Sequence, residues 1–514
     1  MAENTKLPLS WQIRKAFWNK LLTAKYTGNK PADIPLPEDG QDKIKLEALN
    51  SVYPDIDISN IKVADHIPND EKSVLKNTFV QGQVFLGRIN SQMQSGLPEI
   101  SGDPQQAMDD AYTKAHLKLF PRPKLPAELK ADDLTGTLAT LATTGPFAAY
   151  LEKKSEREFQ WNLLDLNHFE HHDGLKKIGV KVSFKSSDGS ASPSPFSIET
   201  DIGKYSEKSP EWNDAVKLAL CAASNHTSLI RHFNHLHLAC GAHIAIATRN
   251  QLNAKHPVKR LIWSSMYGSQ YSNNIVMEPQ LGKDGDFVNM FSFTLSGIYS
   301  LYSKTYPEYN IVVLNPPRDA KRRGLDHVAF PTPTLDNLTA LFKVIHDYTK
   351  KYIEHYFADD ESVSSNAELV AWFKELESSI PNGITMITDG VITRASLAEL
   401  CASFIYLGAV DHEILGTNLW NYQLWTHIIP TRCYQNGQRE PVDVYQRLVN
   451  ANFNLNVNRA KLIHDYTYLA LDDKGIELFN DFQQSLKTLN TEMRALPTTF
   501  WKIYPDMLEA NMNA

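Results

Sequence analysis

The spacing of apolar residues changes along the chain. Residues 1 to about 130 mix helix-like pieces with proline-rich connectors. The segments 179–184 and 196–201 then alternate apolar and polar side chains like β-strands, on either side of a polar loop. From Glu211 onward, apolar residues recur every three or four positions, which predicts helices over 212–252, 335–358, 366–377, 395–412 and 475–495.

These patterns predict a mainly α fold with two parts. Residues 1–130 would form a helical and proline-rich extension packed on the main body, and residues 131–514 would form a large helical domain with a small antiparallel β element. The amphipathic segment 9–26 has a second interpretation, peripheral contact with a membrane, although packing on the main body is the more common role of such a helix.

Composition narrows the class of protein. The 514 residues are 42% hydrophobic and 22% charged, as in a soluble globular protein, and the net charge of -7 argues against a nucleic-acid partner. The four cysteines show no CxxC pair and lie in apolar surroundings, so we expect reduced core residues and a cytoplasmic protein. Neither a signal peptide nor a stretch long enough to span a membrane is evident.

One predicted helix is unusually rich in histidine. Six of the 17 histidines lie between residues 225 and 257, most of them on an apolar helix: His226, His232, His235, His237, His243 and His256. A buried imidazole needs a hydrogen-bond partner or a metal ion. A single one is most often a satisfied core residue, but several at near-helical spacing favour a metal site completed by a facing helix. His412, at the end of the apolar helix 395–412, is the candidate on that facing helix.

Five stretches, in order, resemble conserved motifs of the lipoxygenases. Trp212 and Lys217 open the histidine helix as the family's W-x-x-A-K helix does. "IATRNQLNAKHPVKRLI", "LNPPRDAKRRG" and the block from "FPTPTLDNL" to "AELVAWFKEL" follow, and "LAELCASFIYLGAVDH" is similar to the family's helix L-V-E-(x)12-H. The resemblance implies a lipoxygenase-like helical catalytic domain over 131–514. Because the first 130 residues show no run of alternating strands, we expect a short form without the family's N-terminal lipid-binding β-barrel.

The resemblance also implies a metal site. In the family, a non-haem iron is held by two histidines of the first helix, one of the second, an Asn or His four residues later, and the C-terminal carboxylate. His232 and His412 fall on two of these positions, and Ala514 would present the carboxylate at the end of "YPDMLEANMNA". Manganese is the alternative metal.

Three positions depart from that pattern. The first ligand position holds Thr227, so the neighbouring His226 is the expected ligand, brought round by a π-bulge, and His237 is the alternative. The fourth side-chain position is Gly416, which has no donor atom, so water or Asn418 would have to fill it. The family's glutamine beside the ligands falls near Leu419.

A further match, "YSNNIVMEPQL", bears on the position of oxygen insertion. It resembles the family's I-N-x-x-A-R-x-x-L helix, but Met277 replaces the small residue beside the oxygen channel and Glu278 replaces the arginine. The resemblance therefore predicts neither the position nor the stereochemistry of oxygen insertion in this protein.

The function that the resemblance implies is insertion of O2 into a polyunsaturated fatty acid to give a hydroperoxide. Two alternatives are an oxygenase of the same fold with altered chemistry or a non-lipid substrate, and a catalytically silent lipid-binding relative. Metal content separates the last from the other two.

Overall fold

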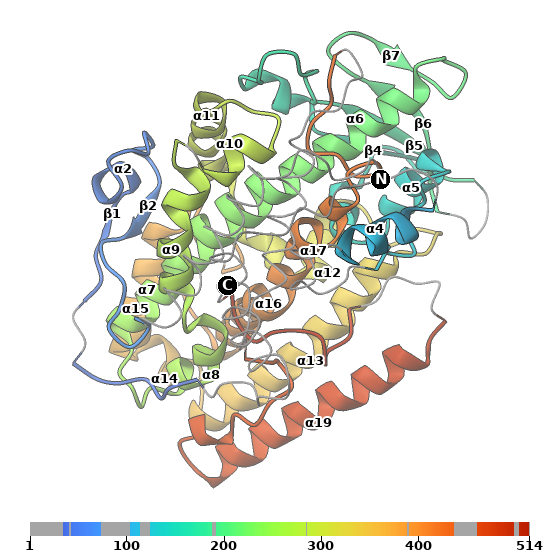
Figure 1. Cartoon of the computed structure of the whole chain (residues 1–514). Helices are drawn as coiled ribbons and strands as arrows, with labels where there is room; N and C mark the ends of the chain where they lie inside the picture. The colour runs from blue at the N-terminus through green and yellow to red at the C-terminus, as the bar shows by residue number, and fades with distance from the viewer. Residues whose placement is uncertain are drawn as a thin grey trace.

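A computed structural model of the chain describes residues 34–40, 43–72, 103–113, 124–187, 192–283, 285–387, 390–435, 460–497 and 503–512. The fold is mainly α with small antiparallel sheets, as predicted (Figure 1). The strands β1 (Leu46–Ala48) and β2 (Lys62–Ala64) lie in the part predicted to be helical and proline-rich. The segment 9–26 and Ala514 lie outside the described residues, so the predictions made for them are not addressed by the fold.

Two nearly continuous helices form the centre. The first runs through α6 (Trp212–Asn225), the π-helix η4 (His226–Gly241) and α7 (Ala242–Gln251). The second runs through α16 (Arg394–Tyr406), the short π-helix η7 (Leu407–Asp411) and α17 (His412–Trp420). Both are buried on almost every side, which is the expected position for helices that are apolar all round. The prediction for 212–252 is confirmed, and the predicted helix 395–412 continues two turns further.

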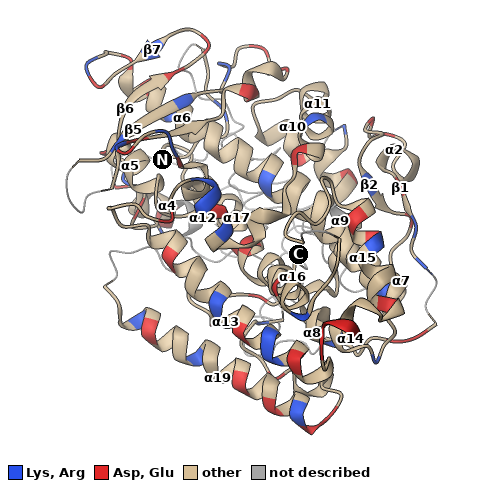
Figure 2. Cartoon of the chain, turned by 180° about the vertical axis from the view of Figure 1, so that it is seen from behind, with Lys and Arg blue, Asp and Glu red and all other residues tan. Residues whose placement is uncertain are grey.

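The other helices pack around this pair. Trp372 on α15 donates a hydrogen bond to Thr248 on α7 (2.9 Å), and Tyr348 on α13 stacks on Phe482 of α19 (ring centroids 4.3 Å). Acidic and basic residues are interspersed along α19 (Figure 2). The surrounding helices are α8 (Pro257–Met266), α9 (Ser269–Leu281), α10 (Asp286–Met290), α11 (Leu295–Thr305), α12 (Pro316–Arg322), α13 (Pro333–Tyr356), α14 (Asp360–Ser364), α15 (Ala367–Ser379) and α19 (Asp473–Ala495). Among the described helices, none has the length and apolar character needed to cross a membrane.

An antiparallel sheet of five strands lies at one end of α6. The two predicted strands are its centre, β5 (Lys181–Lys185) and β6 (Ser194–Glu199), with Val182 opposite Ile198. The other strands are β3 (Glu152–Lys153), β4 (Glu158–Asn162) and β7 (Lys204–Tyr205), in the order β3-β4-β5-β6-β7. The sequence analysis missed β4, although Phe159 and Trp161 alternate with polar residues there and are both buried.

The described parts of residues 34–141 lie against this body. They comprise β1 (Leu46–Ala48), α2 (Leu49–Val52), β2 (Lys62–Ala64), α4 (Pro104–Thr113) and α5 (Leu134–Leu141), with β1 and β2 forming a hairpin. Asp70 and Glu71 pair with Arg249 on α7, and Trp263 on α8 donates to the Pro35 carbonyl (2.7 Å). The boundary at residue 130 remains a prediction.

Candidate metal centre

The π-helical backbone of η4 puts His232 and His237 on one face. In an α-helix, residues five apart point about 140° away from each other, because each residue turns the chain by about 100°. In a π-helix each backbone hydrogen bond joins residues five positions apart, so a residue and the fifth one after it are about one turn apart and lie on the same face. The amide of Ala242 bonds to the carbonyl of His237 in this way. As a result, Nε2 of His232 and Nε2 of His237 lie 3.3 Å apart.

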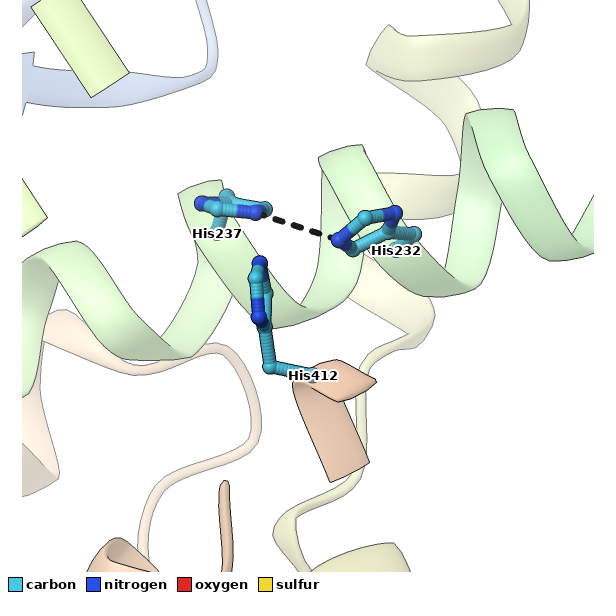
Figure 3. A group of neighbouring side chains, drawn as sticks. All are labelled: His232, His237 and His412. Atoms are coloured by element: carbon cyan, nitrogen blue, oxygen red, sulfur yellow. Dashed lines mark hydrogen bonds between the residues drawn. The ribbon is translucent and has the colours of Figure 1, made fainter. Parts of the chain in front are cut away.

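His412 points at this pair from the second central helix (Figure 3). Its ring centroid is 4.9 Å from that of His232 and 5.1 Å from that of His237. One nitrogen from each of the three rings lies within 4.8 Å of the others. The three side chains belong to residues only 2% (His232), 5% (His237) and 2% (His412) exposed. We call these three residues the histidine cluster.

Hydrogen bonds from neighbouring residues orient two of the rings. The Asn273 side-chain NH2 donates a hydrogen bond to the His237 carbonyl, so the Asn273 amide oxygen faces Nδ1 of His237 at 2.9 Å and accepts a hydrogen bond from it. Glu413 lies 3.3 Å from Nδ1 of His412 and can accept in the same way. Nε2 is then the lone-pair nitrogen of both His237 and His412.

The cluster fits a first-row divalent metal. Burial lowers the pKa of His237 to about 4, and its hydrogen bond to Asn273 offsets this only in part, so the ring is neutral at physiological pH. Neutral imidazoles with a fixed lone pair are the usual nitrogen ligands of iron, manganese and zinc, and partners such as Asn273 and Glu413 are the groups that hold such ligands in place.

His226, the expected first ligand, is not in this cluster. His226 lies six positions before His232 in the π-helix, one more than the five that bring residues to the same face, so the two rings lie on different sides of η4. Its Nδ1 lies 3.1 Å from the hydroxyl of Tyr150, which in turn lies 2.7 Å from the hydroxyl of Thr227. Tyr150 is the last residue of the 3-10 helix η2 (Pro146–Tyr150). The π-helical phase therefore brings His237, the alternative, to the cluster in place of His226.

The remaining histidines of this stretch have partners outside the cluster. Nε2 of His235 lies 2.7 Å from the Thr305 carbonyl, and Nε2 of His243 lies 2.7 Å from the Tyr306 hydroxyl. His256 caps α8 by accepting a hydrogen bond from the amide of Val258. Most of the imidazoles on this helix are thus hydrogen-bonded core residues, as expected for single buried histidines.

Comparison with known proteins identifies the fold family. The sequence model of the lipoxygenase family matches residues 146–458, which is more than half of the chain. The chain belongs to the lipoxygenase family. Solved lipoxygenases superpose on nearly all of it: a coral 8R-lipoxygenase (TM-score 0.71, 12% identity) covers 99% of this chain with 82% of its own, and a calcium-dependent 11R-lipoxygenase (TM-score 0.72, 15% identity) covers 99% with 81%.

Curated lipoxygenases match over shorter stretches. Linoleate 9S-lipoxygenase 2 of Oryza sativa subsp. japonica is 23% identical over 309 residues, 52% of this chain and 35% of the relative. A manganese lipoxygenase of Pyricularia oryzae is 24% identical over 236 residues, 43% of this chain and 38% of the relative. The chain thus aligns with little more than a third of the length of these two relatives, which are oxidoreductases by name.

Gly416 occupies the position one turn after His412 on α17. A β-carbon built on it would overlap the six-membered ring of Trp420. The indole of Trp420 lies 5.9 Å from the ring of His412 and 6.2 Å from that of His232, measured between centroids. The structure therefore places an aromatic ring where the sequence analysis expected water or Asn418.

Asn418 and Leu419 face elsewhere. The Asn418 side-chain amide donates to the Ser224 carbonyl and to the Ser228 hydroxyl, both at 2.9 Å, so it ties α17 to the first central helix. Leu419 is buried in the apolar core. On α9, Met277 is buried and Glu278 is exposed. The residues that sequence reasoning missed are Asn273, Glu413 and Trp420. Asn273 lies in the motif "YSNNIVMEPQL" and Glu413 is adjacent to His412, whereas no pattern pointed to Trp420.

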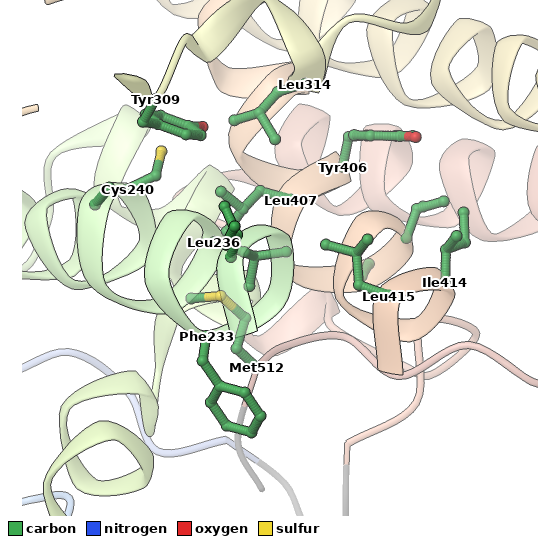
Figure 4. Close-up of a cluster of buried hydrophobic side chains, with 14 of the residues drawn as sticks. Phe233, Leu236, Cys240, Tyr309, Leu314, Tyr406, Leu407, Ile414, Leu415 and Met512 are labelled. Atoms are coloured by element: carbon green, nitrogen blue, oxygen red, sulfur yellow. The ribbon is translucent and has the colours of Figure 1, made fainter. Parts of the chain in front are cut away.

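The described end of the chain approaches the cluster end of η4. Met512 is buried, and a β-carbon on Gly241 would overlap its terminal methyl group. Figure 4 shows Met512 beside Phe233 and Leu236 of η4. Backbone hydrogen bonds from Leu462 to Leu508 and from Ala510 to Ala460 hold this segment in place. Ala514, the remaining ligand expected from the sequence, lies outside the described residues.

A separate pocket is lined by residues from both central helices. Arg231 and Asp411, each adjacent in sequence to a cluster histidine, line it together with Tyr406, but none of the three cluster histidines does. Burial raises the pKa of Asp411 to about 6, which the positive charge of Arg231 only partly offsets. The pocket and the histidine cluster therefore share no lining residue.

Proposed function

We propose that this lipoxygenase is a metal-dependent dioxygenase that inserts O2 into a polyunsaturated fatty acid. The metal would be iron or manganese, held by His232, His237 and His412, with Ala514 as a further ligand. The observation that carries the proposal is the convergence of three buried imidazoles, two of which have Nε2 fixed as the lone-pair nitrogen. His237 replaces His226 in this ligand set because only His237 shares a face of η4 with His232.

The bound metal would supply the one-electron redox chemistry needed to remove a hydrogen atom from a carbon between two double bonds. The chain's own residues keep the cluster neutral, oriented and dry. Asn273 and Glu413 hold the rings of His237 and His412. Phe233 stacks on His237 at 5.7 Å and meets Phe287 at 4.6 Å, which gives the cluster an apolar wall. Such a wall excludes water from a reactive centre and suits an apolar substrate.

The substrate class is supported by the relatives. The rice and fungal relatives are a linoleate lipoxygenase and a manganese lipoxygenase by name. One structural neighbour was solved in complex with arachidonate (TM-score 0.68, 14% identity). Linoleate and arachidonate are therefore the substrates to test first.

Two measurements test the proposal. Metal analysis of the purified chain should give about one iron or manganese per molecule, and oxygen uptake should follow addition of linoleate or arachidonate, with formation of a conjugated diene. A saturated acid of the same length is the matched control and should be inert, because it has no carbon between two double bonds. A metal-free chain that still binds fatty acid would instead be a silent lipid-binding relative. A metal-loaded chain that consumes no oxygen with either acid would be an oxygenase with another substrate.

A further inference from the structure

The indole of Trp420 has an unusual position on α17. His412, Gly416 and Trp420 are spaced by four residues, so they lie on one face of the helix, one turn apart. The middle residue has no side chain, and the indole folds back into the space that a side chain there would take. It reaches both His412 and His232, which belong to different helices.

The position of this indole determines which ligand atoms α17 can provide to a metal ion. The position one turn after His412 is the next one on this helix whose side chain would point at the cluster. Glycine has no donor atom there, and an indole N–H donates hydrogen bonds but has no lone pair with which to bind a metal. α17 therefore contributes one imidazole and one aromatic surface.

Trp420 also connects the cluster to the solvent. The three histidines and Gly416 are buried, whereas Trp420 keeps part of its surface accessible. An indole that touches a buried cluster and is itself reached by solvent covers that cluster.

We propose that Trp420 determines which ligands the metal centre can take. Its indole, which packs over Gly416, would keep a fourth side-chain ligand and water away from the side of the metal that faces α17. This inference rests on the proposed function. It adds that the coordination number is set by a glycine and a tryptophan that contribute no ligand atom. Gly416 is required because any side chain there displaces the ring, and the overlap involves the tip of a side chain, so the indole moves rather than the backbone.

The first experiment needs no metal. In the metal-free protein, Gly416→Ala should push the indole outward and increase quenching of tryptophan fluorescence by acrylamide. The same substitution in a Trp420→Phe background should leave the quenching unchanged, because the displaced ring is then absent. Trp372→Phe is the matched control, since Trp372 is buried and distant from Gly416 in sequence. Equal quenching of the wild type and Gly416→Ala would overturn the packing on which the inference depends.

The second experiment uses cobalt(II), whose visible absorption weakens as the coordination number rises. Trp420→Ala should weaken the bands because water enters, Gly416→Ala should shift them in the same direction, and Trp420→Phe should leave them close to wild type. Adding an amide in the double variant Gly416→Asn/Trp420→Ala should raise cobalt(II) affinity about tenfold over Trp420→Ala. Circular dichroism and thermal unfolding establish that each variant is folded.

The outcomes separate the two proposals. If the wild-type chain binds no cobalt(II), the proposed metal centre falls and this inference with it. If cobalt(II) binds but its spectrum is the same in the wild type, Trp420→Ala and Gly416→Ala, only the role of Trp420 is overturned. If Gly416→Asn alone gains as much affinity as the double variant, the indole does not exclude a fourth ligand.

Discussion

The first central helix holds two histidine sites that use the same side chain in opposite ways. At its π-helical start, His226 faces the hydroxyls of Tyr150 and Thr227, so its ring is one member of a hydrogen-bonded group. Further along, His232 and His237 face each other and His412, so the ring nitrogens of the three imidazoles are one another's neighbours. Imidazoles that point at one another in a buried site need a shared proton or a metal ion, whereas His226 needs neither. The difference lies in the partners that other elements bring.

The largest effect should come from removing the cluster histidines. His232→Ala, His237→Ala and His412→Ala should each reduce bound iron or manganese from about one per chain to a small fraction, because a site with so few donors cannot spare one. His226→Ala is the matched control on the same helix and should keep its metal. Metal analysis by mass spectrometry decides the comparison. Metal loss in His226→Ala with retention in His237→Ala would reverse the assignment of the two sites.

A second effect concerns the C-terminal segment, whose last described residue, Met512, lies beside the end of η4 that follows His237. Met512 packs against Gly241, one turn beyond His237. We expect that residues appended after Ala514 would displace its carboxylate and abolish oxygen uptake without unfolding the chain, whereas the same tag before Met1 would be tolerated. Oxygen uptake and metal content are measured together with circular dichroism. Normal turnover and metal content in the C-terminally extended protein would remove Ala514 from the ligand set.

A third effect is on the pH dependence of stability. Burial lowers the pKa of His226 from 6.5 to about 3, with smaller contributions from His235 and Arg231. The folded chain therefore keeps the ring neutral, while the unfolded chain binds a proton below about pH 6.5. The stability that the neutral ring contributes is fully present above that pH and is lost as the pH falls toward 3.

His226→Gln tests this, since glutamine can accept the hydrogen bond but does not titrate. Between about pH 7.5 and pH 5, the free energy of unfolding of the metal-free wild type should fall by about 1 to 2 kcal/mol more than that of the variant. Urea unfolding at both pH values gives the difference. Identical losses would mean that the His226 ring is protonated in the folded chain.

The comparison also shows what the sequence could predict. Apolar periodicity was enough to place the two central helices, and the order of the motifs was enough to bring His232 and His412 together, at 4.9 Å between ring centroids. The choice between His226 and His237 was beyond reach, because it depends on the hydrogen-bonding phase of η4. It depends also on Tyr150, 76 residues before His226, and on Asn273, 36 residues after His237. Local spacing contains no information on such distant partners.

Trp420 was missed for a related reason. The glycine at position 416 was visible as a missing donor, but nothing in the spacing indicates which side chain fills the space above it. That is decided by the rotamer of a residue one turn later and by its contacts with His232 on another helix. A sequence that lacks a ligand therefore does not show whether water, another donor or an apolar ring takes its place.

The smallest effect is expected from a change beside His226, and it tests whether the His226 site is independent of the histidine cluster. The Tyr150 hydroxyl lies 3.1 Å from Nδ1 of His226 and 2.7 Å from the Thr227 hydroxyl. Burial raises the pKa of Tyr150 to about 12, so the hydroxyl stays protonated and can donate a hydrogen bond to the imidazole. Tyr150→Phe should lower the free energy of unfolding by about 1 to 2 kcal/mol, because the buried Thr227 hydroxyl and the partly buried His226 ring lose a partner.

The same variant should leave metal content unchanged, since Tyr150 touches no member of the histidine cluster in the part of the chain that the structure describes. Tyr356→Phe is the control: its hydroxyl bonds to Asp472 at the surface, where loss of a hydrogen bond costs about 0.5 kcal/mol or less. Urea unfolding and metal analysis of both variants give the comparison. A Tyr150→Phe chain that loses its metal would tie the His226 group to the metal centre, and the two histidine sites would then have to be treated as one.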